Sequence, residues 1–403
     1  MDIELGAVPR GPLVGVRVID ASAVVSGPMC GQVLGDLGAD VIKVESETGD
    51  VTRHLGAEGR TTLSGLFVQY NRNKRSVALD LKRDAGREAF LTLCDTADIL
   101  LENYRPGVAD RLGVGYEAVR ARNPGIIYVA ISGYGPDGPY AALPAYDMVI
   151  QGQSGFATTL GDDENPKLIS NLVADKTTGL TAAYSLLAAL YAREKNGGRG
   201  QRIDIPMIDA FASFVLGDAY APQTFGGPAI PRAGDGVYRA WKTRDGHVAF
   251  LIIEDRQYQA MCRVLDREDI IDEPAFATLP ARLANAPDLL ALLEVEVAEW
   301  KTAELVERAI AFGAPLGEVH GIEGFLDDPQ VRHNHIHFQL EHPTGVTVRV
   351  FRSPPRYSST PTSVRRVPPV LGQHTDEVLR EAGLGEDEIR AATGRPDGGA
   401  EER

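Results

Sequence analysis

The sequence is poor in cysteine and lacks several motifs that identify common enzyme classes. Its three cysteines, Cys30, Cys94 and Cys262, are far apart and form no C-x-x-C pair. This spacing argues against a zinc site or a disulfide framework, and the low cysteine content is typical of a reducing compartment. The sequence also has no G-x-x-x-x-G-K-[ST] motif and no G-x-S-x-G motif. These absences argue against a P-loop protein and against a serine hydrolase.

Long apolar runs and an excess of positive charge are also missing. The longest nearly apolar stretch, residues 182–192, is far shorter than the ~20 residues that a membrane span needs. The N-terminus has neither the basic nor the apolar region of a signal peptide, so we expect a cytoplasmic protein without a membrane partner. Acidic residues outnumber basic ones by 56 to 41, a net charge of −15. This charge repels nucleic-acid backbones, so we expect no nucleic-acid partner, although a pocket for one small anion is still allowed.

The first third of the chain alternates between strand and helix patterns. With 403 residues, 43% of them apolar, the chain can form more than one domain and bury a large core. Short β-branched runs alternate with amphipathic stretches, and Gly38 stands where the first helix should end. This alternation predicts an α/β fold with a parallel sheet. The predicted strands are 16–20, 40–45, 76–81, 99–102 and 126–132, and the predicted helices are 27–37, 84–97 and 116–123.

The remaining two thirds have more varied patterns. Residues 221–236 are rich in Gly and Pro and are typical of a linker or an active-site loop. Asp245-Gly246 predicts the turn of a hairpin within 241–254, and residues 327–350 have the pattern of strands. Further predicted elements are a strand at 202–205 and helices at 177–193, 209–219, 256–265, 288–300, 302–313 and 375–382.

Gly133, Gly135 and Gly138 form a G-x-G-x-x-G motif directly after a predicted strand. A dinucleotide-binding site also needs a helix after this motif, and Pro136 and Pro139 interrupt that helix. We therefore favour a tight loop over a ligand or partner rather than a nicotinamide or flavin site.

His333, His335 and His337 alternate along a predicted strand, so their side chains would share one face. Three such histidines could bind a metal ion, but no Asp, Glu or Cys nearby completes a recognisable ligand set. We favour a solvated strand face and predict no metal site.

Asp175 directly precedes the predicted helix 177–193 and allows two interpretations. It could be an N-cap, which stabilises a helix by about 1 kcal/mol. The same helix end favours an ionised carboxylate, which could attack an acyl carbon in a partly dry pocket. Position alone favours the cap.

Basic residues gather in Asn73-Lys74-Arg75 and around Lys82, and Arg105 and Arg111 follow Asn103-Tyr104. Taken alone, these are ordinary surface charges. Together on an α/β sheet they could bind the phosphates of a nucleotide, with Tyr104 as a stacking face.

These motifs together resemble family III coenzyme A transferases, the group that also contains the α-methylacyl-CoA racemases. The motifs occur in the family's order over nearly all of residues 11–215, residues 371–384 match the family's usual ending, and residues 220–330 match weakly. The matching segments are GPLVGVRVIDASAVVSGPMCGQVLGDLGADVIKVE, NRNKRSVALDLK, LLENYRPGVADRLG, YVAISGYGPDGPY, PAYDMVIQGQSG, VADKTTGLTAAYSLLAALYAREKNGGRGQ, DIPMIDA and LGQHTDEVLREAGL.

The resemblance implies an α/β protein with a Rossmann-like large domain, which holds the parallel sheet, and a smaller α+β domain. The large CoA-binding domain would comprise residues 1–215 and 331–403, a Gly/Pro-rich linker residues 216–240, and the small domain residues 241–330. It also implies an interlocked homodimer, with the active site at the domain and subunit boundary.

The resemblance further implies a transferase that moves CoA from an acyl-CoA donor to a free carboxylic acid. The family's catalytic aspartate falls on Asp175, which would form a mixed anhydride and then an aspartyl-CoA thioester. No metal and no permanently bound cofactor is implied, since coenzyme A is a substrate and a product. The implied CoA-binding residues are Val24, Leu79, Lys82, Asn103, Tyr104, Arg111 and Leu112.

Four further residues are expected to support the reaction or to distinguish its alternatives. Gly234 and Gly236 could supply backbone N–H donors and a lid. Tyr146 could pack under the acyl pocket; it stands where the racemases carry a histidine base, and tyrosine is a poor base at neutral pH. Glu254 stands where the racemases also carry a Glu. An α-methylacyl-CoA racemase or isomerase and a non-catalytic acyl-CoA-binding protein stay open as alternatives.

Overall fold

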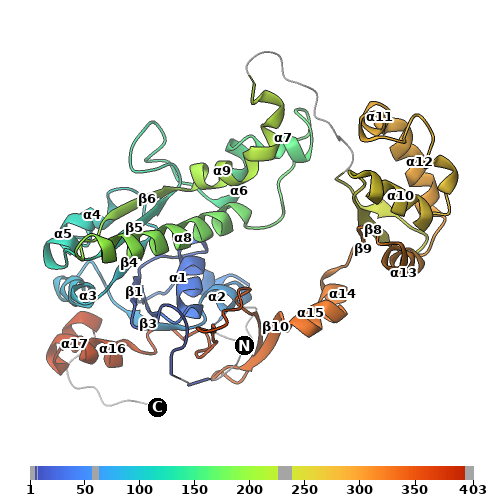
Figure 1. Ribbon diagram of the computed structural model, residues 1–403. Helices are drawn as coiled ribbons and strands as arrows, with labels where there is room; N and C mark the ends of the chain where they lie inside the picture. The colour runs from blue at the N-terminus through green and yellow to red at the C-terminus, as the bar shows by residue number, and fades with distance from the viewer. Residues whose placement is uncertain (1–4, 7, 57–62, 226–237, 395–403) are drawn as a thin grey trace. The chain divides into compact units, whose positions relative to one another are not determined.

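The structure, a computed structural model, describes residues 5–6, 8–56, 63–225 and 238–394. The chain divides into two compact units (Figure 1). The larger comprises Met1–Ala219 and His335–Arg403, and the smaller comprises Tyr220–Asn334. Within the described ranges, no helix has the length and apolar character needed to cross a membrane.

A six-stranded parallel sheet forms the centre of the larger unit, which confirms the predicted α/β class. Its strands are β1 (Arg17–Asp20), β2 (Asp40–Glu45), β3 (Lys74–Ala78), β4 (Ile99–Glu102), β5 (Ile127–Ser132) and β6 (Arg202–Pro206). They lie in the order β3-β2-β1-β4-β5-β6. Val18 and Ile19 point to opposite faces of the central strand β1, and both are fully buried. Apolar residues on both faces are expected when helices cover both sides of a parallel sheet.

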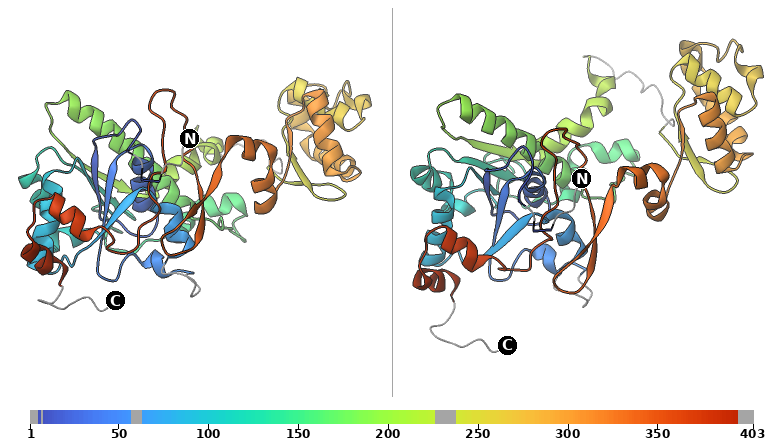
Figure 2. Two further views of the ribbon diagram at one scale, coloured as in Figure 1. Left: turned by 90° about the horizontal axis from the view of Figure 1, so that it is seen from below. Right: turned by 60° about the horizontal axis from the view of Figure 1, so that its bottom comes forward.

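Helices cover both faces of this sheet (Figures 1 and 2). The helices of the larger unit are α1 (Ser26–Asp36), η1 (Val51–His54), α2 (Gly65–Tyr70), α3 (Asp84–Asp95), α4 (Val108–Arg111), α5 (Tyr116–Arg122), α6 (Asp147–Gln153), α7 (Phe156–Leu160), α8 (Val173–Lys195), α9 (Met207–Ala219), α16 (Thr375–Glu381) and α17 (Glu386–Thr393). One core contains Leu34 of α1, Leu186 of α8 and Phe211 of α9. The other contains Phe90 of α3 and Leu379 of α16, so the C-terminal helices, red in Figure 2, pack against the N-terminal half.

The smaller unit combines a short antiparallel sheet with helices. Its elements are η2 (Ala221–Gln223), β7 (Trp241–Lys242), β8 (His247–Phe250), α10 (Asp255–Val264), η3 (Glu268–Ile270), α11 (Leu279–Ala284), α12 (Ala286–Ala298), α13 (Thr302–Phe312), β9 (Leu316–Glu318), α14 (Ile322–Asp327) and α15 (Pro329–Asn334). Strands β7 and β8 form the predicted hairpin, and β9 pairs with β8. Its core includes Trp241, Tyr258, Leu293 and Leu305, all buried.

The prediction that residues 327–350 are strands is wrong over its first part. Residues 329–334 form helix α15, and only β10 (His337–Glu341) and β11 (Thr347–Phe351) are strands. His333 therefore lies on a helix, His335 has a positive φ of 49° and His337 begins β10, so the three histidines do not share a strand face. In the described part of the chain, no group of three or more His, Cys, Asp or Glu is placed to hold a metal ion.

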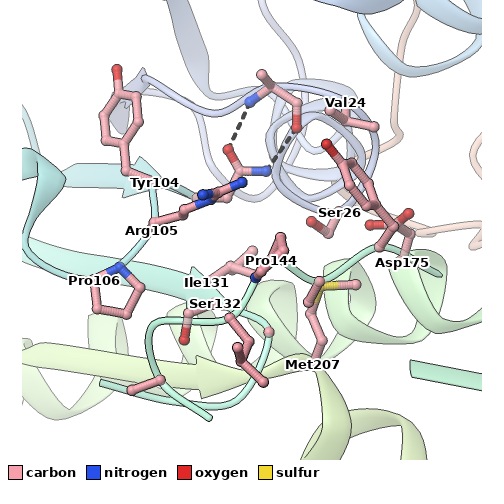
Figure 3. A pocket seen from close by; sticks show the side chains of 17 residues that line it. Val24, Ser26, Tyr104, Arg105, Pro106, Ile131, Ser132, Pro144, Asp175 and Met207 are labelled. Atoms are coloured by element: carbon pink, nitrogen blue, oxygen red, sulfur yellow. Dashed lines mark hydrogen bonds between the residues drawn. The ribbon is translucent and has the colours of Figure 1, made fainter. Parts of the chain in front are cut away.

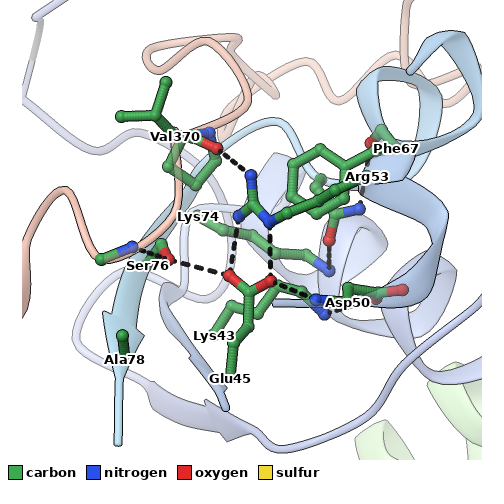
Figure 4. A network of polar contacts seen from close by, with 12 residues as sticks. Lys43, Glu45, Asp50, Arg53, Phe67, Lys74, Ser76, Ala78 and Val370 are labelled. Atoms are coloured by element: carbon green, nitrogen blue, oxygen red, sulfur yellow. Dashed lines mark hydrogen bonds and ion pairs between the residues drawn. The ribbon is translucent and has the colours of Figure 1, made fainter. Parts of the chain in front are cut away.

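Two lysines of the sheet are completely buried (Figure 4). The ammonium of Lys74 on β3 donates hydrogen bonds to Asp20 Oδ2 at 2.8 Å and to Asn71 Oδ1 at 2.9 Å. The ammonium of Lys43 on β2 donates to Asp50 Oδ2 at 3.0 Å. Burial lowers the pKa of Lys74 to about 8, against the opposing effect of Asp20. Both charges are compensated, which is the condition for keeping ions in a protein interior.

A third ion pair, between Arg53 and Glu45, attaches the C-terminal segment to the sheet. The Arg53 guanidinium donates two hydrogen bonds to the Glu45 carboxylate, at 2.8 and 2.7 Å, and one to the carbonyl of Pro369 at 3.0 Å. Ser76 Oγ donates to Glu45 at 2.8 Å and accepts from the Gly372 N–H at 2.9 Å. Residues separated by about three quarters of the chain are therefore held by one buried group of charges.

We predict that Lys74→Met destabilises the protein by about 3–5 kcal/mol, because Asp20 would be left as a buried charge without its partner. Urea unfolding followed by circular dichroism measures this loss. Arg120→Gln is the matched control: Arg120 pairs with Glu117 at an exposed site, where an ion pair contributes less than about 1 kcal/mol. Equal losses in the two variants would contradict the role assigned to the buried pair.

Candidate active site

A cavity of about 240 Å³ lies at the carboxyl ends of β1, β4 and β5, the usual place for a ligand in an open α/β sheet (Figure 3). Tyr104 and Arg105 lie on one side of it, and Asp175 and Met207 on the other (Figure 3). The lining residues are Ala23, Val24, Ser26, Asn103, Tyr104, Arg105, Pro106, Ile131, Ser132, Gly133, Ala141, Leu143, Pro144, Ala145, Tyr146, Asp175 and Met207.

The loop between β1 and α1 forms one wall and is held in a strained conformation. Val24 has φ = 70°, in the left-handed region that a β-branched residue rarely adopts. Its N–H donates to the Asp50 carboxylate at 3.2 Å, and Asp50 is the partner of the buried Lys43. The Asn103 side chain accepts from the Ala23 N–H at 2.8 Å and donates to the Ala23 carbonyl at 2.7 Å. Such strain costs about 1–3 kcal/mol and persists only where surrounding contacts fix it.

The loop after β5 forms the opposite wall. It contains the G-x-G-x-x-G motif, and the next helix is α6, which begins only at Asp147. The motif therefore lacks the helix of a dinucleotide site, as Pro136 and Pro139 led us to expect. Gly133 is required for packing, because a Cβ there would stand 2.2 Å from the Cβ of Ala145, which lines the cavity.

Asp175 is buried, with 7% of its surface exposed, and lies in the first turn of α8. Burial is the main cause that raises its pKa, and the nearby charge of Asp147 raises it further. Hydrogen bonds from the side chain and backbone N–H of Ser26 oppose this shift, and the pKa is about 6. At neutral pH the carboxylate is therefore ionised and more basic than an ordinary aspartate.

The expectation that Asp175 precedes its helix is wrong. Helix α8 starts at Val173, four residues earlier than predicted, and its N-cap is Leu172, which has no side-chain acceptor. The Asp175 N–H is instead capped by another segment: Asp147 Oδ2 accepts from it at 3.0 Å. Since Asp147 satisfies this backbone donor, the Asp175 carboxylate is available for a ligand.

The cavity brings together only some of the residues expected to bind CoA. Val24, Asn103 and Tyr104 line it together with Asp175. The other four do not line it: Leu79 is buried in the sheet, Lys82 and Arg111 are exposed, and Leu112 follows α4.

The four supporting residues are also in different places. Tyr146 lines the cavity and is the N-cap of α6, with its side chain largely exposed. Glu254 belongs to the smaller unit, where it is the N-cap of α10 and forms a capping box with Gln257. Gly234 and Gly236 lie outside the described residues.

Sequence reasoning missed two functional candidates, Ser26 and Asp147, which lie beside Asp175. Arg105 lines this cavity and also an adjoining one of about 220 Å³. Among the described residues, neither Arg105 nor Arg111 has an ionic partner, unlike most arginines of this protein. The role of Asp147 is seen only from its hydrogen bond to the Asp175 N–H, which joins α6 to α8. The sequence around Asp147 does not predict this contact.

Comparisons with known proteins show which family the chain belongs to and which solved structures share its fold. The family model described as CoA-transferase family III matches residues 13–375. The chain is 34% identical over 385 residues to a succinate–glutarate CoA-transferase of Agrobacterium fabrum, covering 92% of this chain and 96% of that one. It is 33% identical over 400 residues to a formyl-CoA:oxalate CoA-transferase of Streptomyces avermitilis, covering 94% and 97%. A crystal structure of a CAIB/BAIF family protein from Brucella suis superposes with a TM-score of 0.80 at 32% identity, covering 93% and 100%.

We predict that Asp175→Asn stabilises the protein at about pH 8 by roughly 1–3 kcal/mol, measured by urea unfolding. The folded-state pKa of about 6 lies above the ordinary value for aspartate, so the folded protein loses stability as the pH rises through this interval. The gain should therefore shrink as the pH falls from about 6 toward about 4, where Asp175 becomes neutral. A gain that is independent of pH, or a loss at pH 8, would contradict the assigned ionisation.

Proposed function

Because the chain belongs to CoA-transferase family III, we propose that it moves coenzyme A from an acyl-CoA donor to a free carboxylic acid through covalent chemistry on Asp175. One observation carries the proposal. A buried, basic carboxylate stands in a cavity together with Val24, Asn103 and Tyr104, which the resemblance assigned to CoA binding.

In the proposed reaction, Asp175 first takes the acyl group from the donor and then takes CoA itself. Asp175 attacks the thioester carbonyl of the donor, the C–S bond breaks, and CoA thiolate leaves a mixed anhydride behind. The thiolate then attacks the Asp175 carbonyl, expels the donor acid as its carboxylate and forms an aspartyl-CoA thioester. The acceptor carboxylate repeats both steps in reverse, which yields the new acyl-CoA and restores Asp175. Every nucleophile and every leaving group is an anion, so no net proton transfer is needed.

The environment of Asp175 suits this chemistry in two ways. With a pKa of about 6 it is ionised at neutral pH, and its raised basicity makes it a better nucleophile. Its burial reduces contact with water, which would hydrolyse the anhydride. The Ser26 side chain and N–H lie at the start of α1 next to Asp175 (Figure 3), so we assign to them the stabilisation of the tetrahedral oxyanion.

We propose that CoA lies along the Tyr104 side of the cavity. Lys82, Arg105 and Arg111 would neutralise its phosphates, and Tyr104 with Leu112 would contact its adenine, while the buried Leu79 would pack beneath them. The Asn103 side chain is already bonded to both backbone groups of Ala23, so we assign it to holding the Val24 loop against the ligand.

We also propose that the protein acts as a homodimer. Leu180, Tyr184, Leu187 and Tyr191 of α8 recur at helical spacing, and all four are exposed on the isolated chain. An apolar stripe of this kind is typical of an interface that is covered by another protein surface.

We predict that Asp175→Ala lowers CoA exchange by at least about 10³-fold, because the alanine removes the carboxylate that carries the proposed covalent intermediates. Transfer of CoA from a set of acyl-CoAs to isotopically labelled carboxylic acids, followed by mass spectrometry, measures exchange. Calorimetry should show that CoA binding stays within about threefold of wild type, since the alanine removes no proposed CoA contact.

Asp163→Ala is the matched control for this experiment, because Asp163 is an exposed aspartate in the loop between α7 and α8. Undiminished exchange in Asp175→Ala would refute the nucleophile. Rapid uptake of deuterium at the α-carbon of a branched acyl-CoA in heavy water would favour a racemase. CoA binding by the wild type without exchange of any acyl group would favour a non-catalytic binding protein.

A further inference from the structure

Asp147 is a buried carboxylate that bridges two helices beside Asp175. It is the first residue of α6 and only 4% exposed. Its Oδ2 accepts from the Asp175 N–H at 3.0 Å, and its Oδ1 accepts from Gln151 Nε2 at 2.6 Å. Gln151 in turn accepts from the Ile169 N–H at 2.9 Å, so α6 also holds the segment that leads into α8.

The start of α8 requires such a partner. The first N–H groups of any helix lack intrahelical acceptors, and the N-cap Leu172 offers no side-chain oxygen. Asp147 supplies the missing acceptor at the residue whose side chain enters the cavity. It thereby fixes the backbone position of Asp175. A displacement of a reacting group by about 1 Å can lower the reaction rate about 10²-fold.

Asp147 also places a second negative charge beside Asp175. Both side chains are buried, and in the described ranges Asp147 has no ionic partner that would cancel its charge. The other charged or titratable groups around Asp175 offset little of the repulsion between its carboxylate and that of Asp147. Tyr70, at the end of α2, has a pKa raised by burial and by Asp175, so it stays neutral, and the Lys176 ammonium is bonded to Asn171 at an exposed site. Tyr146 and Arg105 line the same cavity.

We propose that Asp147 is a positioning residue for the transfer reaction, which holds the Asp175 backbone in place and keeps a repelling charge next to its carboxylate. This inference rests on the proposed function. Attack on a thioester moves negative charge away from Asp175, and both covalent intermediates leave it neutral. The repulsion is therefore present in the free enzyme and relieved in the transition state, which is the condition for an interaction to accelerate a reaction.

The test uses Asp147→Asn, which keeps an oxygen that can accept from the Asp175 N–H but removes the charge. The acidic limb of the pH profile of kcat/KM reports ionisation of Asp175. We expect its midpoint to shift to lower pH by roughly half a pH unit or more. On the plateau, kcat should fall about three- to tenfold, because the less basic carboxylate is a weaker nucleophile. Asp147→Ala also removes the cap, and its kcat should fall about 100-fold.

Two controls separate charge from structure. Gln151→Ala disturbs the same hydrogen bonds but keeps the Asp147 charge, so its acidic limb should stay at the wild-type pH. Asp163→Asn removes an exposed aspartate and should leave both the limb and kcat unchanged.

The outcomes distinguish this inference from the proposed function. If the wild type exchanges CoA through Asp175 and Asp147→Asn keeps the wild-type limb and kcat, the inference is overturned and the function stands. If Gln151→Ala shifts the limb as far as Asp147→Asn does, the effect is structural and the inference is again overturned. A wild type without exchange overturns the proposed function itself.

Discussion

The buried charges on β1, β2 and β3 and on the segment that follows β2 are the constraint on which the site depends. Lys43 and Lys74 have no access to water, so Asp20 and Asp50 must stand opposite them. The Asp50 carboxylate also accepts a hydrogen bond from the Val24 N–H, which holds the Val24 backbone in the left-handed region. The network thereby determines the shape of the loop that faces Asp175, and through Arg53 it also attaches the C-terminal segment.

The site itself is destabilising, and this is consistent with a catalytic role. Asp175 is ionised in a buried position near a second carboxylate, and Val24 has a strained backbone. Either feature alone would be costly in an ordinary core. They persist because Ser26 donates hydrogen bonds to Asp175, while Asp50 and Asn103 accept hydrogen bonds from the backbone of the Val24 loop. Proteins commonly give up stability in this way where a reaction needs preorganised groups.

Much of the fold could be predicted because local patterns agree with the final packing. The strands of the sheet contain short β-branched runs, and Gly38 with φ = 107° ends α1 where it was expected. The start of α8 could not be predicted, because its cap comes from Asp147, 28 residues away in the chain. The histidines at 333–337 were misplaced because alternation over only five residues is too short a pattern to distinguish a helix from a strand. Motifs identified Asp175, whereas Asp147 and Ser26 became visible only through tertiary contacts.

The most direct test of the account is to trap the covalent enzyme. The wild type and Asp175→Ala are mixed with a set of acyl-CoAs, treated with hydroxylamine or borohydride, digested and analysed by mass spectrometry. The account predicts a modification on the peptide that contains Asp175 in the wild type and none on the corresponding peptide of the variant. A wild type that turns over while this peptide stays unmodified, or a modification on another residue, would contradict it.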